Sequence, residues 1–359
     1  MKLNAKNFAI LQTLICRAKH LATNYEIILL TNSKEKTSNI SDYTGYSVTS
    51  EFFTGEEQSM ICTSLDHMGF HVRQFFNEED FIRFVAMTQE DLSRKIVINS
   101  AQKGTKIGRK SLIPALCDLY NIPHTGSNPY IVSLCRDKYR SSSILKQNGV
   151  QTPRSWLYQP GTGWLGNSSF PSQGRFIVKP NYEAASIGID ASNICLAGSD
   201  LSQKVAEVSS NYRQEVLVEE FIPGYEVEVP VIFTEKPLTF FPVGIKLDGS
   251  RKMGDRILDY HLRDVDAYEY FDFCEEQPHV AKKVTDIAEQ IARLLSINGF
   301  GRIDFRIMEN GDIYTTDIAT NPHYTEKSSY EFLFYQLGFT YDDLIACLIA
   351  SSIAGGVES

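Results

Sequence analysis

The stretch that decides the fold is residues 299–325, GFGRIDFRIMENGDIYTTDIATNPHYT. Its Asn-Gly pair at 310–311 is typical of a two-residue β-hairpin turn, because both central residues of such a turn need a positive φ. When the strands are paired outward from this turn, Asp304 faces Asp317. Side chains directly opposite one another lie about 4.5–5.5 Å apart at Cβ. The sequence therefore predicts two aspartates face to face on a hairpin.

Two carboxylates so placed repel each other unless one is protonated or a cation lies between them. Oxygen ligands of this kind suit Mg²⁺. Arg302 comes two residues before Asp304 and therefore shares its face of the strand. A cation-binding carboxylate pair beside a fixed guanidinium is suited to handling phosphate. The alternative is that both aspartates lie on a solvated face of the sheet.

Composition sets the broad class of the protein. The 359 residues are enough for two or three domains, and the net charge of −9 argues against a general binder of nucleic acid or of an anionic membrane. Seven cysteines occur without a CxxC pair, so we expect neither a disulfide framework nor zinc, and a reducing, cytoplasmic location. No apolar run approaches the roughly 18 residues of a membrane helix.

Strands and helices alternate along residues 1–135, which predicts an α/β domain with a parallel, doubly wound sheet. Two smaller α+β parts are expected after it, at residues 136–214 and 215–359. Strands are expected at residues 25–31, 71–75, 95–99 and 176–180, and helices at 56–68, 111–120, 138–148, 280–295 and 327–353. Residues 32–55 are polar and weakly patterned, so we expect a long loop there.

Lys179 ends an apolar strand and precedes the small-residue turn EAASIG at 183–188. A lysine in this position can hold a phosphate while backbone N–H groups of the turn surround it. The alternative is an edge lysine that reaches into solvent. Further on, residues 219–222 offer an apolar edge suited to a flat purine, and Glu226 follows across a Pro-Gly turn, where it could accept hydrogen bonds from ribose. The alternative here is a plain hairpin with acidic outer residues.

From about residue 95 to 350 the chain resembles the ATP-grasp superfamily, and within it the D-alanine–D-alanine ligases. The resemblance implies a fold in which the N-terminal domain is followed along the chain by two α+β subdomains that bind ATP between them. Five segments in the family's order carry it, namely IPHTGS (122–127), CRDKYRSSSILKQNGVQTP (135–153), IVKPNYEAASIGI (177–189), VLVEEFIPGYEVEV (216–229) and GRIDFRIMENGDIYTTDIATNPHYTEKSS (301–329).

The resemblance also implies site residues. The residues implied to bind ATP are Lys138 and Lys179 on the phosphates, Glu183 to Ser186 in a loop over the γ-phosphate, Glu219, Glu220, Phe221 and Ile222 at the adenine, Glu226 at the ribose, and Arg263 in a loop near the phosphates, where the family has a lysine. Asp304 and Asp317 would bind Mg²⁺, or Mn²⁺ in its place. The implied catalytic residues are Arg302, which stabilises the tetrahedral intermediate, with Ser186 and Lys179. Ser328 would hold the carboxylate of the second substrate.

The chain departs from the family at several positions. Ala319 stands where the family has an asparagine as third metal ligand, and Asn321 could replace it. Asp317 stands where a glutamate is usual. His323 takes the place of a glycine in the loop that binds the substrate's anionic group, and Ala185 the place of a serine in the substrate loop.

Arg109 and Lys110 replace an acidic pair of the family, near its amino-acid substrates. This reversal of charge predicts an acidic or phosphorylated first substrate. The same two residues lie in GTKIGRKS at 104–111, which resembles a P-loop, but Arg109 stands where that motif needs glycine.

We therefore expect an ATP-dependent ligase that forms an amide bond between a carboxylate and an amine through an acylphosphate. Its substrates are small molecules, and family analogy implies a homodimer. Two alternatives stay open at this point. The protein could join substrates other than alanine, acidic ones included, or it could bind nucleotide without turnover, because Asp317 and Ala319 alter the metal site.

Overall fold

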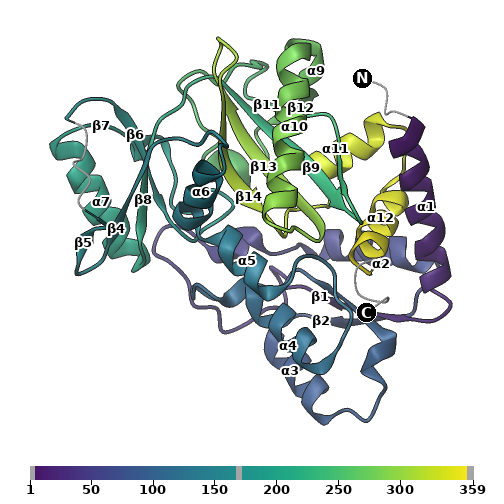
Figure 1. Cartoon of the computed structure of the whole chain (residues 1–359). Helices are drawn as coiled ribbons and strands as arrows, with labels where there is room; N and C mark the ends of the chain where they lie inside the picture. The colour runs from purple at the N-terminus through teal and green to yellow at the C-terminus, as the bar shows by residue number, and fades with distance from the viewer. Residues whose placement is uncertain (1–4, 167–171, 354–359) are drawn as a thin grey trace.

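Alternating strands and helices in the first part of the chain form a parallel sheet, as predicted. β1 (Glu26–Leu30) lies between β2 (Val72–Phe75) and β3 (Lys95–Asn99) and pairs with both in parallel. Helices α2 (Gly55–His67), α3 (Glu78–Met87) and α4 (Leu112–Tyr120) accompany it. The computed structural model describes residues 5–166 and 172–353, and this sheet occupies the lower part of Figure 1.

The central part is an antiparallel five-stranded sheet in the order β5-β4-β8-β6-β7. Its strands are β4 (Ser155–Gln159), β5 (Gly163–Trp164), β6 (Arg175–Pro180), β7 (Ile194–Leu196) and β8 (Val216–Glu220). α7 (Ser199–Tyr212) packs on it through Leu201, Val205 and Val208. This layer stands apart at the left of Figure 1.

The C-terminal part is an antiparallel sheet in the order β12-β11-β9-β13-β14, with β10 also on β9. Its strands are β9 (Tyr225–Phe233), β10 (Pro237–Thr239), β11 (Val243–Lys246), β12 (Glu269–Asp272), β13 (Gly299–Ile307) and β14 (Ile313–Ala319). The helices of this part are α8 (Tyr260–Asp264), α9 (Phe273–Glu276), α10 (Pro278–Leu294), α11 (Ser329–Gln336) and α12 (Tyr341–Ile353). α5 (Pro129–Arg136) and α6 (Lys138–Gln147) also pack against β14.

The hairpin weighed for the Pro223-Gly224 turn is wrong, because β8 and β9 belong to different sheets. β8 pairs with β4 and β6, whereas β9 pairs with β10, β11 and β13. The chain therefore changes sheets at Pro223-Gly224 rather than at residue 214. At this crossing Gly224 has a φ of +131° and passes close to the backbone of Ile307.

We expect Gly224→Ala to destabilise the protein by more than about 2–3 kcal/mol, because a Cβ there would lie 2.0 Å from the carbonyl oxygen of Ile307. Gly249→Ala is the matched control, since Gly249 also has a positive φ, +74°, but has open space around it. That variant should lose only about 1–2 kcal/mol. Urea denaturation measures both, and equal losses would contradict the steric explanation.

The aspartate hairpin forms with a different turn from the predicted one. Only Gly311 of the Asn-Gly pair has a positive φ, and the loop holds three residues between Met308 and Asp312. Ile307 therefore faces Ile313, where a two-residue turn would have placed Tyr314. A bulge after Asp304 shifts the register by one residue, so that Asp304 does face Asp317 as predicted.

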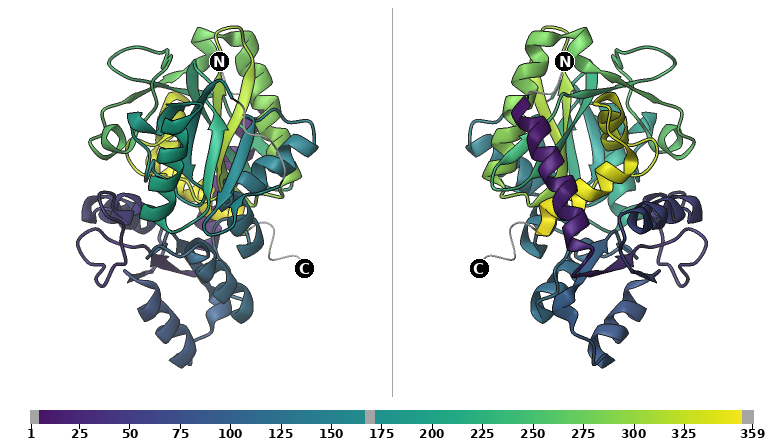
Figure 2. Two further views of the ribbon diagram at one scale, coloured as in Figure 1. Left: turned by 90° about the vertical axis from the view of Figure 1, so that its left-hand side faces the viewer. Right: turned by 90° about the vertical axis from the view of Figure 1, so that its right-hand side faces the viewer.

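The N-terminal helix α1 (Ala5–Leu21) packs against the last helix of the chain, α12. It packs along α12 through Leu11, Leu14 and Ala18, and both side views of Figure 2 are consistent with this contact. Within the described residues, no single helix is long and apolar enough to span a membrane. The pair α11 and α12 passes that test only together, and it is bent by 113°.

Candidate active site

A cavity of about 710 Å³ is lined by residues from all three parts of the chain. Nearly all of the residues proposed from the sequence line it. They are Lys110, Lys138, Lys179, Glu183, Ser186, Glu219, Glu220, Phe221, Ile222, Glu226, Arg263, Arg302, Asp304, Asp317, Asn321, His323 and Ser328. Arg109 is the exception, because its side chain is buried behind the cavity wall.

Each of the two lysines proposed for the phosphates has an acidic partner in the cavity. Nζ of Lys138, at the start of α6, lies 2.6 Å from Oδ1 of Asp317 on β14. Nζ of Lys179, at the end of β6, lies 2.6 Å from Oε2 of Glu219 on β8. Burial alone would raise the pKa of Asp317, but Lys138 and then Lys179 lower it. Two ammonium groups from different elements thus point into one cavity beside a predicted metal ligand.

Arg302 and Asp304 are joined on β13 by a two-pronged ion pair. Nε and Nη2 of Arg302 each lie 2.7 Å from a carboxylate oxygen of Asp304. Glu228 on β9 lies opposite Asp304, and its Oε1 is 3.3 Å from Nη1 of Arg302. Burial, followed by the nearby Glu228 and Asp317, raises the pKa of Asp304 although Arg302 opposes this. Glu228 was not found from the sequence, where it looks like an ordinary strand residue.

Carboxylates from three strands meet at this point. Asp304, Asp317 and Glu228 lie beside Arg302 and Lys138, and Oε2 of Glu228 is buried with no hydrogen-bond partner in the described part of the chain. Carboxylate oxygens gathered in this way fit a hard divalent cation. Asn321 lines the same cavity and could add an amide oxygen.

The predicted phosphate loop forms a tight turn in which Ala185 and Ser186 have φ values of +50° and +55°. The N–H of Ile187 donates to the carbonyl of Ala184 at 2.9 Å and closes the turn. Left-handed backbone at two successive residues other than glycine costs about 1–2 kcal/mol each. The Ser186 hydroxyl donates to the carbonyl of Leu258 at 2.7 Å. The surrounding contacts thus hold the loop in a strained shape over the cavity.

The residues proposed for adenine and ribose are linked by Arg306 of β13. Its guanidinium lies 5.5 Å from the ring centre of Phe221, and its Nε donates to the carbonyl of Ile222 at 2.9 Å. Its Nη1 lies 3.2 Å from Oε2 of Glu226. Arg306 thus connects Phe221, Ile222 and Glu226 and holds them in place at this edge of the cavity.

The short helix α8 borders the cavity. Its Arg263 belongs to the lining, and the guanidinium lies 6.0 Å from the ring centre of Tyr268. Tyr260 of the same helix accepts a hydrogen bond from the N–H of Ser47 at 3.3 Å and packs against Tyr46. The predicted loop 32–55 therefore reaches across to α8.

His323 lies where the C-terminal part meets α2. Its Nε2 is 2.7 Å from Oε1 of Glu57 and 2.5 Å from Oγ1 of Thr325. Burial tends to raise the pKa of Glu57, but hydrogen bonds from His323 and Thr325 lower it to about 2. Ser328 is the N-cap of α11, where its side chain accepts from the N–H of Glu331. A helix N-terminus that opens on the cavity favours a bound carboxylate.

The lowered pKa of Glu57 stabilises the fold above about pH 4.5, and this contribution is lost as the pH falls toward 2. We expect Glu57→Gln to cost about 1–2 kcal/mol at pH 5.5, after an allowance for solvent screening. The cost should shrink by about half at pH 3.5. Urea denaturation at both pH values measures it, with exposed Glu56→Gln as control. A cost that does not change with pH would contradict this assignment.

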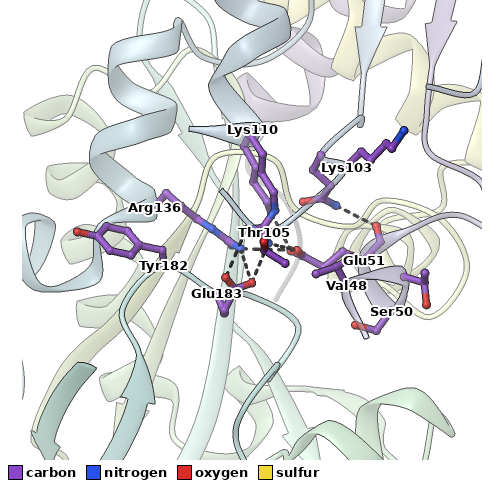
Figure 3. A network of polar contacts seen from close by, with 12 residues as sticks. Val48, Ser50, Glu51, Lys103, Thr105, Lys110, Arg136, Tyr182 and Glu183 are labelled. Carbon is purple, nitrogen blue, oxygen red and sulfur yellow. Dashed lines mark hydrogen bonds and ion pairs between the residues drawn. The ribbon is translucent and has the colours of Figure 1, made fainter. Parts of the chain in front are cut away.

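A buried group of charges, here called the wall cluster, consists of Glu51, Arg109, Lys110, Arg136 and Glu183 (Figure 3). Nη2 of Arg109 lies 3.0 Å from Glu51 and 2.7 Å from Glu183, and Nζ of Lys110 lies 2.8 Å from Glu51. Burial would raise the pKa of Glu51, but Lys110, Arg136 and Arg109 hold it well below its usual range.

The wall cluster bears on two interpretations of Arg109 and Lys110. The P-loop motif already fails at Arg109, and this residue does not line the cavity. That the two residues attract an acidic substrate stays a prediction for Lys110, which lines the cavity, whereas Arg109 does not. Glu183 is also held in the wall by Arg109, although the resemblance placed it among the ATP ligands.

The fold and the convergence of these residues define an ATP-grasp protein. The sequence model of the D-ala D-ala ligase C-terminus family matches residues 168–350. The chain belongs to this family, and it is an ATP-dependent ligase that forms C–N bonds.

Relatives extend the match toward the N-terminus. The D-alanine–D-alanine ligase of Thermotoga petrophila is 26% identical over 298 residues, which cover 82% of this chain and 90% of that protein. That of Natranaerobius thermophilus is 26% identical over 281 residues, covering 74% and 72%. An uncharacterized protein of Sinorhizobium fredii is 25% identical over 239 residues, covering 65% and 67%.

Solved structures share the fold at low sequence identity. The D-alanine–D-alanine ligase of Bacillus anthracis complexed with ATP has a TM-score of 0.67 and 17% identity, covering 93% of this chain and 99% of that one. The VanG D-Ala:D-Ser ligase of Enterococcus faecalis has a TM-score of 0.64 and 16% identity, covering 92% and 99%.

Proposed function

We propose that the protein uses ATP to activate the carboxylate of one amino acid and joins it to the amine of a second, through an acylphosphate. The observation that carries this proposal is the arrival of Lys138, Lys179, Arg302, Asp304 and Asp317 in one cavity from four different elements. Cations for the phosphates, carboxylates for a metal and a fixed guanidinium are the groups that this chemistry needs.

The reaction divides into two balanced steps. A carboxylate oxygen of the first amino acid attacks the γ-phosphorus, and ADP leaves. The amine of the second attacks the acyl carbon, the bond from this carbon to the bridging oxygen breaks, phosphate leaves with that oxygen, and the amine loses a proton. In our proposal Lys138 and Lys179 bind the phosphates, and Arg302 donates hydrogen bonds to the oxyanion of the tetrahedral intermediate. Ser186 orders the loop over the γ-phosphate, and Ser328 holds the second carboxylate.

Asp304 and Asp317, with Asn321, are proposed to hold Mg²⁺, or Mn²⁺ in its place. The bound cation would neutralise the phosphate oxygens of ATP. In their present contacts the two carboxylates are engaged by Arg302 and Lys138, and the buried, unpartnered Oε2 of Glu228 beside them supports a cation at this point.

We expect Asp317→Asn to raise the Mg²⁺ concentration for half-maximal ADP release at least about 10-fold, because one of two charged ligands is lost. Asp312→Asn is the matched control, since Asp312 lies in the exposed loop of the same hairpin. The measurement is a Mg²⁺ titration of activity at saturating ATP. An unchanged Mg²⁺ requirement in the Asp317 variant would remove this residue from the metal site.

The names of the relatives point to D-alanine and D-serine as substrates to test first. His323, which contacts Glu57, puts an imidazole where the family has a glycine in the loop that binds the substrate's anionic group. For this reason we propose a substrate other than D-alanine alone. A homodimer, a cytoplasmic location and the absence of nucleic-acid and membrane partners stay predictions.

The acylphosphate route has a direct test. With an ¹⁸O-labelled carboxylate on the first amino acid, one labelled oxygen should appear in the released phosphate. Label found in AMP would indicate an adenylate instead. Label retained wholly in the amide product and unreacted substrate would contradict activation of the carboxylate.

A further inference from the structure

The wall cluster has an imbalance of charge that its own members do not resolve. Three cations, Arg109, Lys110 and Arg136, face two carboxylates, Glu51 and Glu183, so one positive charge remains. The exposed fraction of each of the five side chains is between 2% and 11%. Leaving a charge unpaired in such a place is costly unless a ligand completes it.

Of the three cations, Arg136 has the longest ion pairs and is therefore the one whose positive charge is least compensated. Arg109 and Lys110 have carboxylate oxygens at 2.7–3.0 Å, whereas Nη2 of Arg136 is 3.5 Å from Glu183 and 3.6 Å from Glu51. Its Nε has no hydrogen-bond partner within residues 5–166 and 172–353. The Arg136 side chain is 8% exposed and belongs to the lining of the cavity, so a weakly paired guanidinium borders the site.

Lys110 lies beside Arg136 and lines the same cavity. Burial and the neighbouring Arg136 lower the pKa of Lys110 to about 8, although Glu51 opposes this. An anion bound between the two side chains would offset the repulsion that adds to the effect of burial. Asp317 lies on the other side of Arg136 and is already held by Lys138 at 2.6 Å.

We propose that Arg136 and Lys110 form an oxyanion-binding subsite of the reaction cavity. This inference rests on the proposed function, because the oxyanion belongs to a reactant. Its two sources are the second carboxylate of an acidic amino acid and a phosphate of ATP. A guanidinium whose ion pairs are long, beside an ammonium, suits either one.

The test compares Arg136→Gln with the wild-type protein. Removal of Arg136 leaves two cations for two carboxylates, so this variant should fold. Arg109→Gln is the matched control, since it strips the close partner from Glu183 and should lower thermal stability without acting on ligands selectively. Arg136→Lys restores the charge and should restore part of the binding.

Two measurements separate the sources. The first is the Kd for ATP and for ADP by titration calorimetry. The second is the affinity and the KM for D- and L-aspartate and glutamate, relative to D- and L-alanine. Loss of ATP affinity by about 10–100-fold in Arg136→Gln assigns a phosphate to the subsite. A comparable loss for acidic amino acids relative to alanine assigns the carboxylate. Unchanged binding of both ligand classes overturns the proposal.

The subsite and the proposed function can fail separately. If the wild-type protein releases no ADP with any amino-acid pair, the proposed function is contradicted, but the calorimetric comparison still decides whether Arg136 binds an oxyanion. If the wild-type protein turns over and Arg136→Gln matches it for both acidic and neutral amino acids and for ATP, only the subsite is wrong.

Discussion

Replacement of Arg302 by methionine should lower kcat by roughly 10²–10³-fold with little change in the Kd for ATP. The guanidinium is oriented by Asp304 through two contacts of 2.7 Å and by Glu228 at 3.3 Å. A donor fixed in this way needs no reorganisation when charge develops on the oxyanion. The measurement is ADP release under saturating substrates, with ATP binding by calorimetry.

Arg302→Met also leaves Glu228 buried without its partner, so a loss of stability has to be separated from a loss of catalysis. Arg302→Lys keeps the charge and tests the paired geometry, and we expect it to recover only a small part of kcat. Arg293→Met, on the exposed side of α10, is the neutral control. Wild-type kcat in a folded Arg302→Met variant would exclude this residue from the chemical step.

Replacement of Lys179 by methionine should weaken ATP binding about 10–100-fold, because a charged hydrogen bond to phosphate is worth about 1.5–3 kcal/mol. Nζ of Lys179 faces the cavity and lies 2.6 Å from Glu219. The loss of Lys179 also leaves the carboxylate of Glu219 unpaired in the cavity. Calorimetric titration with ATP measures both effects together.

The double variant Lys179→Met/Glu219→Gln separates these effects, since it removes the uncompensated carboxylate. We expect it to bind ATP better than Lys179→Met but still below wild type. Lys282→Met, on the exposed face of α10, is the control for loss of a lysine. Full ATP affinity in the double variant would mean that Lys179 only neutralises Glu219.

Local sequence signals predicted the strands β1, β2, β3 and β6 and the aspartate hairpin, but not the strands β7 and β10 to β12 or the pairings between distant strands. The Asp304–Asp317 pair was found although its turn was not, because the bulge after Asp304 offsets the longer loop. The prediction for Pro223-Gly224 failed for the opposite reason, since nothing in a Pro-Gly pair tells a hairpin from a crossing between sheets. Tertiary contacts decide between them.

The wall cluster could not be predicted from the sequence for a similar reason, because its residues are brought together only by tertiary contacts. Glu51 lies in a loop without periodicity, and its partners Arg109 and Arg136 come more than fifty residues later. Arg136 could have been noticed, because it directly precedes the helix-capping Asp137 and lies two residues before Lys138. Helices α3, α5 and α7 were also not expected, and α5 is the element that delivers Arg136 to the cavity.

The most direct test of the central claim is ADP release by the purified protein with ATP and Mg²⁺, against D- and L-amino acids singly and in pairs. The account predicts release that depends on one specific amino acid or pair, with one amide formed for each ADP. Measurable ATP binding without release under any amino acid or pair would contradict the claim that this cavity joins two amino acids.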